Sequence, residues 1–290
     1  MDINFSGVQL LNGLVLSMLL FMLAVGLSVV FGLLDVLNLA HATLYMFGAY
    51  FALMVSRFTG DFWTALLVAP LLVVVIGVLF YETLLKRIRG NHMIQALVTF
   101  GLLFVGYDLV RMIWGNGFHS VPEPALFAFS VPLFGQTYPA YRLFIIGLGI
   151  LTVLLLYFGL ERTRLGAVVR AGVDDRETAM LLGINIDRAF FITFCIGTFL
   201  AGLGGVVAAP VFTVRPGMDV EILIPVLIVV VIGGPGSLKG AILGALVVGM
   251  ADTFGPVLIP NLSSFVIYLV MALVLLLRPR GLLPTRSGAH

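Results

Sequence analysis

Residues 8–33 read VQLLNGLVLSMLLFMLAVGLSVVFGL, a stretch of 26 residues without a charged side chain. A bilayer crossing needs about 20 mostly apolar residues, because about 30 Å of hydrocarbon is spanned at about 1.5 Å per residue. This stretch is therefore long enough to cross a membrane as one helix. The chain begins Met-Asp-Ile-Asn and lacks the basic region of a signal peptide, so we expect the helix to be retained.

Composition extends this expectation to the whole chain. Of the 290 residues, 61% are hydrophobic and 10% are charged, and the mean hydropathy is +1.16. A soluble domain carries about 25% charged residues, so most of this protein's surface must face hydrocarbon. Nine apolar stretches are candidate spans: 8–33, 40–55, 62–81, 93–114, 141–160, 189–209, 222–232, 238–254 and 263–277. The short stretches 40–55 and 222–232 border Gly- or Asn-containing sequence, so we expect an all-α transmembrane bundle of eight or nine spans with broken or re-entrant helices.

The basic residues indicate the orientation, because Lys and Arg concentrate in cytoplasmic loops. Counting spans puts three basic segments on one side: Lys86, Arg87 and Arg89; Arg162, Arg164, Arg170, Arg176 and Arg188; and Arg278, Arg280 and Arg286. The loops 116–140 and 211–221 on the other side contain only Arg215 among Lys and Arg. The C-terminus is then inside, and the N-terminus is outside if all nine spans cross.

The cytoplasmic loop 161–188 carries charges of both signs in a regular pattern. Asp174 followed by Glu177 is a capping-box pattern and Gly183 is a suitable C-cap, so a short helix is predicted at 175–182. Its apolar residues 179–182 must be covered. They either rest on the bundle and the membrane surface or dock onto another protein.

A second irregular segment, 32–42, follows the first span and reads GLLDVLNLAHA. Asp35 and Asn38 would be costly in lipid, because their polar atoms need partners. One interpretation is a helix break beside a polar pathway or an interface. The other is a simple cytoplasmic turn with Asn38 as the N-cap of the next helix.

A third irregular segment, 233–240, reads GGPGSLKG and is too rich in Gly and Pro to be helical. It is not a phosphate-binding loop, because Lys239 follows leucine and no Ser or Thr comes next. Glycines recur every fourth residue beyond it and form a smooth helix face, whose partner lies either within this chain or in another subunit. We expect a packing or hinge role for Gly233, Gly234, Gly236, Gly240 and Gly244.

The ionisable residues in the spans do not suggest chemistry. Glu82, Arg111 and Asp252 lie near predicted span ends, and Asp108 is one turn from Arg111 and predicted to pair with it. A chain of central carboxylates, as in proton-coupled transporters, is not visible, nor is a nucleophile, a general base or a metal-ligand spacing. We therefore expect no catalytic residue, metal or cofactor in this chain.

Five blocks of sequence resemble a known family in order and spacing. They read GLSVVFG at 26–32 leading into LNLAH at 37–41, GAY at 48–50, RAGVDDRETAMLLGIN at 170–185, VIGGPGSLKG at 231–240 and LRPRGLL at 277–283. Together they resemble the permease subunits of branched-chain amino acid ABC importers, which are similar to the permeases for simple sugars. The resemblance covers nearly the whole chain.

The resemblance implies a single transmembrane permease domain, 1–290, in the bacterial inner (plasma) membrane, with a cytoplasmic coupling loop at 161–188. It implies import by alternating access with several partners. These are a homologous second permease or a second copy, two cytoplasmic ATPase subunits that bind ATP and Mg, and an extracytoplasmic solute-binding protein. Nucleic acid is not among the implied partners.

The resemblance also assigns roles to residues. Coupling to the ATPase falls to Arg170, Asp174, Asp175, Glu177, Leu181, Leu182 and Gly183, and the substrate pathway falls to Asn38, His41 and Thr43. Relatives commonly have glycine and then a small polar or acidic residue after this histidine, where Ala42 and Thr43 stand here. The solute is therefore a branched-chain amino acid or, alternatively, an amide, urea or an aromatic or dicarboxylic acid. A stand-alone secondary transporter is the alternative from a different class.

Overall fold

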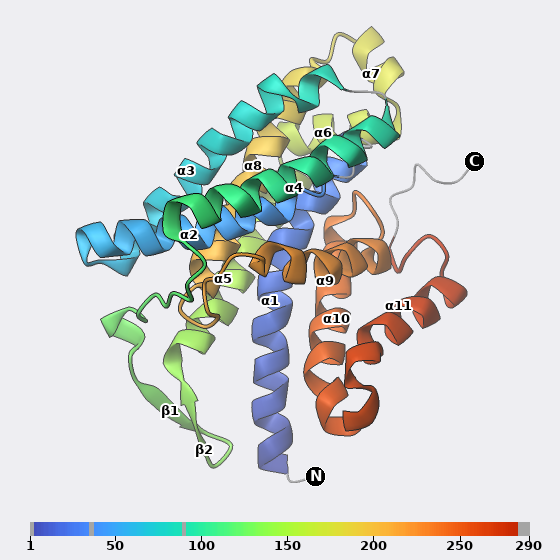
Figure 1. Cartoon of the computed structure of the whole chain (residues 1–290). Helices are drawn as coiled ribbons and strands as arrows, with labels where there is room; N and C mark the ends of the chain where they lie inside the picture. The colour runs from blue at the N-terminus through green and yellow to red at the C-terminus, as the bar shows by residue number, and fades with distance from the viewer. Residues whose placement is uncertain (1–2, 35–37, 89–90, 284–290) are drawn as a thin grey trace.

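The computed structural model describes residues 3–34, 38–88 and 91–283, and within them a bundle of helices carries one short hairpin (Figure 1). The helices are α1 (Ile3–Leu34), α2 (His41–Thr59), α3 (Phe62–Thr83), α4 (His92–Trp114), α5 (Ala140–Leu156), α6 (Arg164–Asp174), α7 (Arg176–Leu181), α8 (Ile186–Ala208), α9 (Met218–Gly233), α10 (Leu238–Leu258) and α11 (Val266–Leu277). Shorter turns are η1 (Leu85–Arg87), η2 (Ala125–Phe127), η3 (Tyr157–Glu161) and η4 (Pro260–Phe265), and the hairpin strands are β1 (Ser130–Leu133) and β2 (Gln136–Pro139). The helical class expected from the sequence is confirmed.

All nine apolar stretches are helical, and their ends follow local signals. Four of these apolar helices begin at a side chain that accepts a backbone N–H of the first turn, as N-caps do: Asp61 from Thr64 at 2.8 Å, Asn91 from Ile94 at 3.1 Å, Asn185 from Arg188 at 2.9 Å and Ser237 from Gly240 at 3.0 Å. Six stretches of the described chain are long and apolar enough to cross a membrane: 7–32, 62–87, 92–114, 140–160, 186–208 and 238–258. A seventh apolar helix, α11, has 12 residues. The number of eight or nine spans stays a prediction.

Helix α8 is the centre of the bundle, with α1, α2 and α3 packed around it. A Cβ built on Gly26 of α1 would lie 2.8 Å from the carbonyl oxygen of Gly197 on α8. A Cβ on Gly205 would lie 2.9 Å from the backbone nitrogen of Ala49 on α2. Real Cβ atoms do not approach other atoms so closely, so these helices meet backbone to backbone at positions that admit only glycine.

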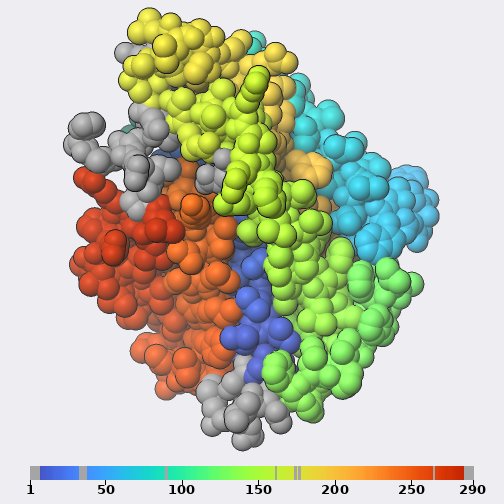
Figure 2. All heavy atoms as spheres, turned by 180° about the vertical axis from the view of Figure 1, so that it is seen from behind, coloured from blue at the N-terminus to red at the C-terminus, as the bar shows by residue number. Residues whose placement is uncertain are grey.

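The two helices that the sequence marked as short, α2 and α9, run across the bundle, whereas α1 and α10 run along it (Figure 1). Most residues of α2 are buried, because α3, α4, α8 and α9 pack against it. Seen from behind, α1 lies in a furrow between α10 and α5 (Figure 2). Irregular backbone at the ends of α2 and α9 is thereby covered by protein, which is the condition for such breaks at membrane depth.

The glycine-rich segment after α9 is a close intrachain junction. Gly240 and Gly244 of α10 face Gly233 of α9, and there is no room for a Cβ on either. The smooth glycine face expected from the sequence therefore packs against a helix of this same chain. Gly236, at φ 75°, donates its N–H to the carbonyl oxygen of Ser28 on α1 at 3.1 Å. The C-terminal segment closes the junction, because Leu282 donates its N–H to the carbonyl oxygen of Ile232 at 2.7 Å. The blocks 26–32, 231–240 and 277–283 therefore meet in one place.

The two ends of the bundle differ. The hairpin and the N-terminal end of α1 lie at one end, and α6 and α7 lie at the other (Figure 1). The hairpin turns at Phe134 and Gly135, whose φ angles of 51° and 71° suit a two-residue turn. The loops 116–140 and 211–221, expected on one side of the membrane, are joined directly, since His119 and Val214 exchange backbone hydrogen bonds of 2.9 Å.

The central packing predicts that Gly205→Ala destabilises the protein by about 1–3 kcal/mol, because the added methyl group meets the backbone of α2. The matched control is Gly101→Ala on α4, where a Cβ meets no atom within 4 Å. We expect the apparent melting temperature in detergent to fall for Gly205→Ala and to hold or rise for Gly101→Ala. Equal melting temperatures for the two variants would show that the close contact is not needed.

Candidate functional site

The segment that leads into α2 is buried and polar. Asn38, His41 and Thr43 are all buried, and the N–H of His41 reaches the carbonyl oxygen of Asn38 at 3.1 Å. The N-cap of α2 is Ala40 and makes no side-chain bond, so the interpretation of Asn38 as the N-cap is wrong. The Oδ1 atom of Asn38 and the Nε2 atom of His41 have no hydrogen-bond partner in the described part of the chain. Asp35 lies outside that part.

Thr43 and His41 face different neighbours. The hydroxyl of Thr43 donates to Oδ2 of Asp219 on α9 at 3.3 Å, across 176 residues of sequence. The His41 ring bonds to the backbone of Leu23 and lies beside Gly26, so it contacts α1. Of the three predicted pathway residues, only Thr43 bonds to a carboxylate. Asn38 and His41 each have a buried polar atom without a hydrogen-bond partner in the described part of the chain.

Asp219 was missed by the sequence analysis. It is fully buried in the first turn of α9, which begins after Gly217 at φ 92°. Backbone N–H groups and the helix dipole favour a negative charge at this position. The available signal was an acidic residue two positions after a Pro-Gly pair and shortly before an apolar run, which is typical of a helix start. The Thr43–Asp219 bond therefore joins the two crossing helices α2 and α9.

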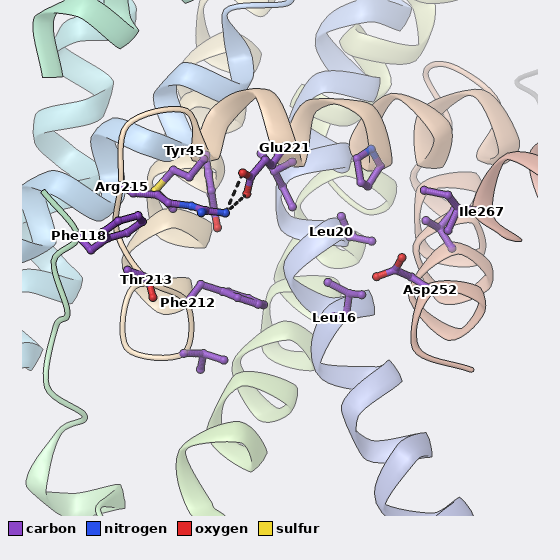
Figure 3. Close-up of a pocket in the computed structure, with 15 residues that line it drawn as sticks. Leu16, Leu20, Tyr45, Phe118, Phe212, Thr213, Arg215, Glu221, Asp252 and Ile267 are labelled. Atoms are coloured by element: carbon purple, nitrogen blue, oxygen red, sulfur yellow. Dashed lines mark hydrogen bonds and ion pairs between the residues drawn. The ribbon is translucent and has the colours of Figure 1, made fainter. Parts of the chain in front are cut away.

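A cavity of about 550 Å³ lies next to this junction, between α1, α9, α10, α11 and the segment 211–215 (Figure 3). Its volume is in the range of about 300–1,000 Å³ that is typical of small-molecule sites. The wall residues are Leu16, Leu20, Tyr45, Phe118, Val211, Phe212, Thr213, Arg215, Met218, Glu221, Ile222, Pro225, Val248, Asp252 and Ile267. The wall includes the loop that the charge pattern places on the outer side of the membrane.

The charged groups of the cavity are on opposite walls (Figure 3). Nη2 of Arg215 lies 2.8 Å from both carboxylate oxygens of Glu221, and its guanidinium group lies 5.9 Å from the Phe118 ring centroid. Asp252 on α10 faces the leucines of α1, six residues before the helix ends. The sequence placed Asp252 near a span end and gave no reason to connect it with Arg215.

The short helix predicted at 175–182 is α7, and it begins one residue later than its capping-box pattern implied. Asp175 is the N-cap: its carboxylate accepts the N–H of Thr178 at 3.0 Å and the Thr178 hydroxyl at 2.6 Å. Asp174 is the last residue of α6, and the side chains of Asp174 and Glu177 lie outside the described part of the chain. After the helix, Gly183 turns at φ 79° and Ile184 donates to the carbonyl oxygen of Ala179 at 3.1 Å, which closes the last turn.

The apolar residues of α7 divide into a buried and an exposed set. Ala179 packs into the bundle, whereas Leu181 is 88% exposed and Leu182 is 76% exposed. Arg170 on α6 donates to the carbonyl oxygen of Leu160 in η3, the turn that follows α5, so it fastens α6 to the bundle. The helix thus presents two leucines on a firmly capped turn at one end of the molecule.

The predicted pair on α4 is present near the C-terminal end of the helix. Arg111 lies 3.5 Å from Asp108 and bonds Asn116 at 2.6 Å. The Asp108 carboxylate and the Arg111 guanidinium group are both exposed. Neither residue lines the 550 Å³ cavity.

Known proteins are similar to this chain over nearly its whole length. Residues 9–275 match the family described as branched-chain amino acid transport system / permease component. The high-affinity branched-chain amino acid transport system permease protein BraD of Pseudomonas aeruginosa is 28% identical over 293 residues, covering 95% of this chain and 94% of BraD. For the permease proteins LivH and LivM of the Escherichia coli system of the same name, identities are 26% and 29%, with 94% of LivH and 68% of LivM covered. The solved structure of PsaBC from Streptococcus pneumoniae in complex with Fab matches with a TM-score of 0.48 at 16% identity, over 92% of this chain and 89% of that chain.

The α2–α9 junction predicts that Thr43→Val lowers stability by about 1–3 kcal/mol, because it removes a hydrogen-bond donor from a buried carboxylate. The matched control is Thr198→Val on α8, since the buried Thr198 hydroxyl has no partner in the described part of the chain. Thermal unfolding in detergent should show a loss for Thr43→Val only. A loss of the same size in Thr198→Val would contradict a specific contribution of the Thr43–Asp219 bond.

Proposed function

Since this chain belongs to the family of branched-chain amino acid transport system permease components, we propose that it is the membrane-spanning subunit of an ATP-binding-cassette importer. The solute is a branched-chain amino acid or a related small molecule, which enters the cytoplasm by alternating access. The names of BraD, LivH and LivM support the substrate class. The family match favours this importer over a stand-alone secondary transporter.

The proposed assembly contains four kinds of protein in the bacterial inner membrane and on its two faces. This chain similarly resembles both LivH and LivM, which are two permease proteins of one Escherichia coli system, and this supports a homologous second permease as its partner. Two ATPase subunits bind ATP and Mg on the cytoplasmic side, and a solute-binding protein delivers the substrate outside. The chain itself acts as one permease domain, 1–290, without a cofactor of its own.

The main support for coupling to an ATPase is the exposure of the leucines at the end of α7. Leu181 and Leu182 are apolar, yet they are exposed at a capped helix at one end of the bundle (Figure 1). Exposed leucines at a rigid end are the features of a helix that inserts into a groove of another protein. We assign the loop 161–188 to ATPase docking, with Asp175 and Gly183 shaping α7 and Arg170 anchoring α6.

The route from α7 to the bundle is short. After Gly183 the chain enters α8 at Ile186, where Asn185 caps the helix. Helix α8 then contacts α1, α2 and α3 through glycines. A push on α7 by the closing ATPases therefore reaches the helices beside the cavity through one continuous element, and smooth glycine contacts let packed helices slide.

Gentle extraction of the tagged chain followed by mass spectrometry tests the assembly. We expect ATPase subunits and a second permease to co-purify in a stable complex. Recovery of the chain alone from several mild detergents would contradict the importer.

The docking role predicts that Leu181→Asp reduces ATP-driven uptake at least tenfold, because a charge replaces an apolar contact of about 1.5–3 kcal/mol. Leu181→Met is the matched control, since it keeps an apolar side chain of similar size, and its uptake should stay near that of the wild type. Uptake by proteoliposomes and the amount of co-purified ATPase measure the effect. Full uptake with normal ATPase recovery in Leu181→Asp would remove α7 from the interface.

A further inference from the structure

Positive charges without a counter-charge lie at the glycine junction of α1, α9, α10 and the C-terminal segment. The segments that form this junction, 26–32, 231–240 and 277–283, contain Lys239, Arg278 and Arg280 but no Asp or Glu. All three basic side chains are exposed, and within the described ranges none of them takes part in a hydrogen bond or an ion pair. The junction therefore attracts an anion that these segments do not supply.

The backbone keeps the segments that carry these charges in direct contact. Gly281, at φ 85°, donates its N–H to the carbonyl oxygen of Arg278 at 2.9 Å, so the chain turns back onto the bundle directly after α11. A Cβ built on Gly281 would lie 2.7 Å from the backbone nitrogen of Gly234. The residue before Gly234 meets Gly240, which follows Lys239 in the first turn of α10. The arginines after α11 and the lysine of α10 thus extend from one tightly packed site.

Helix α11 leads into this site with an uncovered apolar face. Leu269, Leu273, Leu276 and Leu277 recur at the spacing of one helix face and are between 54% and 81% exposed. We call these four residues the leucine stripe. Helix α11 lies at the edge of the molecule in both views (Figures 1 and 2). From Leu269 to Leu277 the helix rises about 12 Å, close to the roughly 15 Å of hydrocarbon in one leaflet. An apolar surface about one leaflet deep therefore ends directly at the basic residues.

We propose that this site binds an anionic phospholipid of the cytoplasmic leaflet, with its acyl chains along the leucine stripe and its phosphate at Lys239, Arg278 and Arg280. Guanidinium groups bind phosphate oxygens through paired hydrogen bonds, and basic sites at the cytoplasmic ends of membrane helices bind head groups of this kind. A zwitterionic phospholipid is a poorer ligand, because the basic residues repel its ammonium group. A protein partner would have to match the stripe and also supply acids at its end, whereas an anionic phospholipid has both parts in this order.

The test measures lipid contact at a reporter on the same helix face. Ala272 is exposed and lies one turn from both Leu269 and Leu276, so Ala272→Cys leaves the leucine stripe intact. The cysteine is labelled with bimane in a Cys195→Ser background, because Cys195 is the one cysteine of the sequence. The complex that co-purifies with the tagged chain is reconstituted in phosphatidylcholine bilayers. Phosphatidylglycerol or phosphatidylcholine with a nitroxide on the acyl chain is then added as the quencher. From the quenching curves we expect phosphatidylglycerol to bind at least about threefold more strongly than phosphatidylcholine.

Charge variants of the reporter chain separate this site from general attraction to a basic surface. Arg278→Gln/Arg280→Gln should abolish the preference for phosphatidylglycerol, and Arg278→Lys/Arg280→Lys should keep it, because the charge remains. Lys239→Gln should lower the preference by itself. The matched control is Lys86→Gln/Arg87→Gln, which removes two exposed basic residues of η1 and should leave the preference unchanged.

Three results would overturn the inference. The first is equal quenching by the two lipids in the unaltered reporter chain. The second is a preference that Arg278→Gln/Arg280→Gln retains or that Lys86→Gln/Arg87→Gln loses to the same extent. The third is a reporter that neither lipid quenches, because a partner subunit would then cover α11. The solute does not enter this measurement, so each result leaves the proposed function standing.

Discussion

The bundle depends on close backbone contact between α8 and the helices around it. Inside a membrane, burying an apolar side chain against another helix gains little over burying it in lipid, so helices associate through packing and interhelical hydrogen bonds. Gly197 meets Gly26 of α1, and Gly205 meets the backbone of α2 near Ala49. These contacts bring main chains together over the middle of the molecule and leave the large apolar side chains of α3, α4 and α5 to face outward.

The central packing covers irregular backbone and buried polar groups that would be too costly in contact with lipid. Because α3, α4 and α8 cover α2, it can start at a break with buried polar atoms and run across the bundle. Helix α9 crosses in the same way, and its first turn carries Asp219 to Thr43. The cavity lies beside this junction, so the polar groups at membrane depth collect where two irregular helix starts meet.

The sequence blocks that resemble the family have different physical roles, which follow from their places in this packing. The blocks 26–32, 231–240 and 277–283 form one junction, held by backbone hydrogen bonds of Gly236 and Leu282. The block 170–185 instead forms α7, which has few contacts with the bundle and presents its leucines outward. One group of blocks therefore sets the shape of the permease, and the other presents a surface to a partner.

The sequence by itself determined the features that depend on residues close together in the chain. Apolar stretches located nine of the eleven α-helices of the described chain, and Gly183 located the end of α7, because helix formation and capping are local. Only the tertiary structure decided which glycine faces meet, that Thr43 bonds Asp219, and that Arg215 and Asp252 share one cavity. Such contacts join residues far apart in the chain, and an apolar pattern that would suit several neighbours does not specify which helix lies beside which.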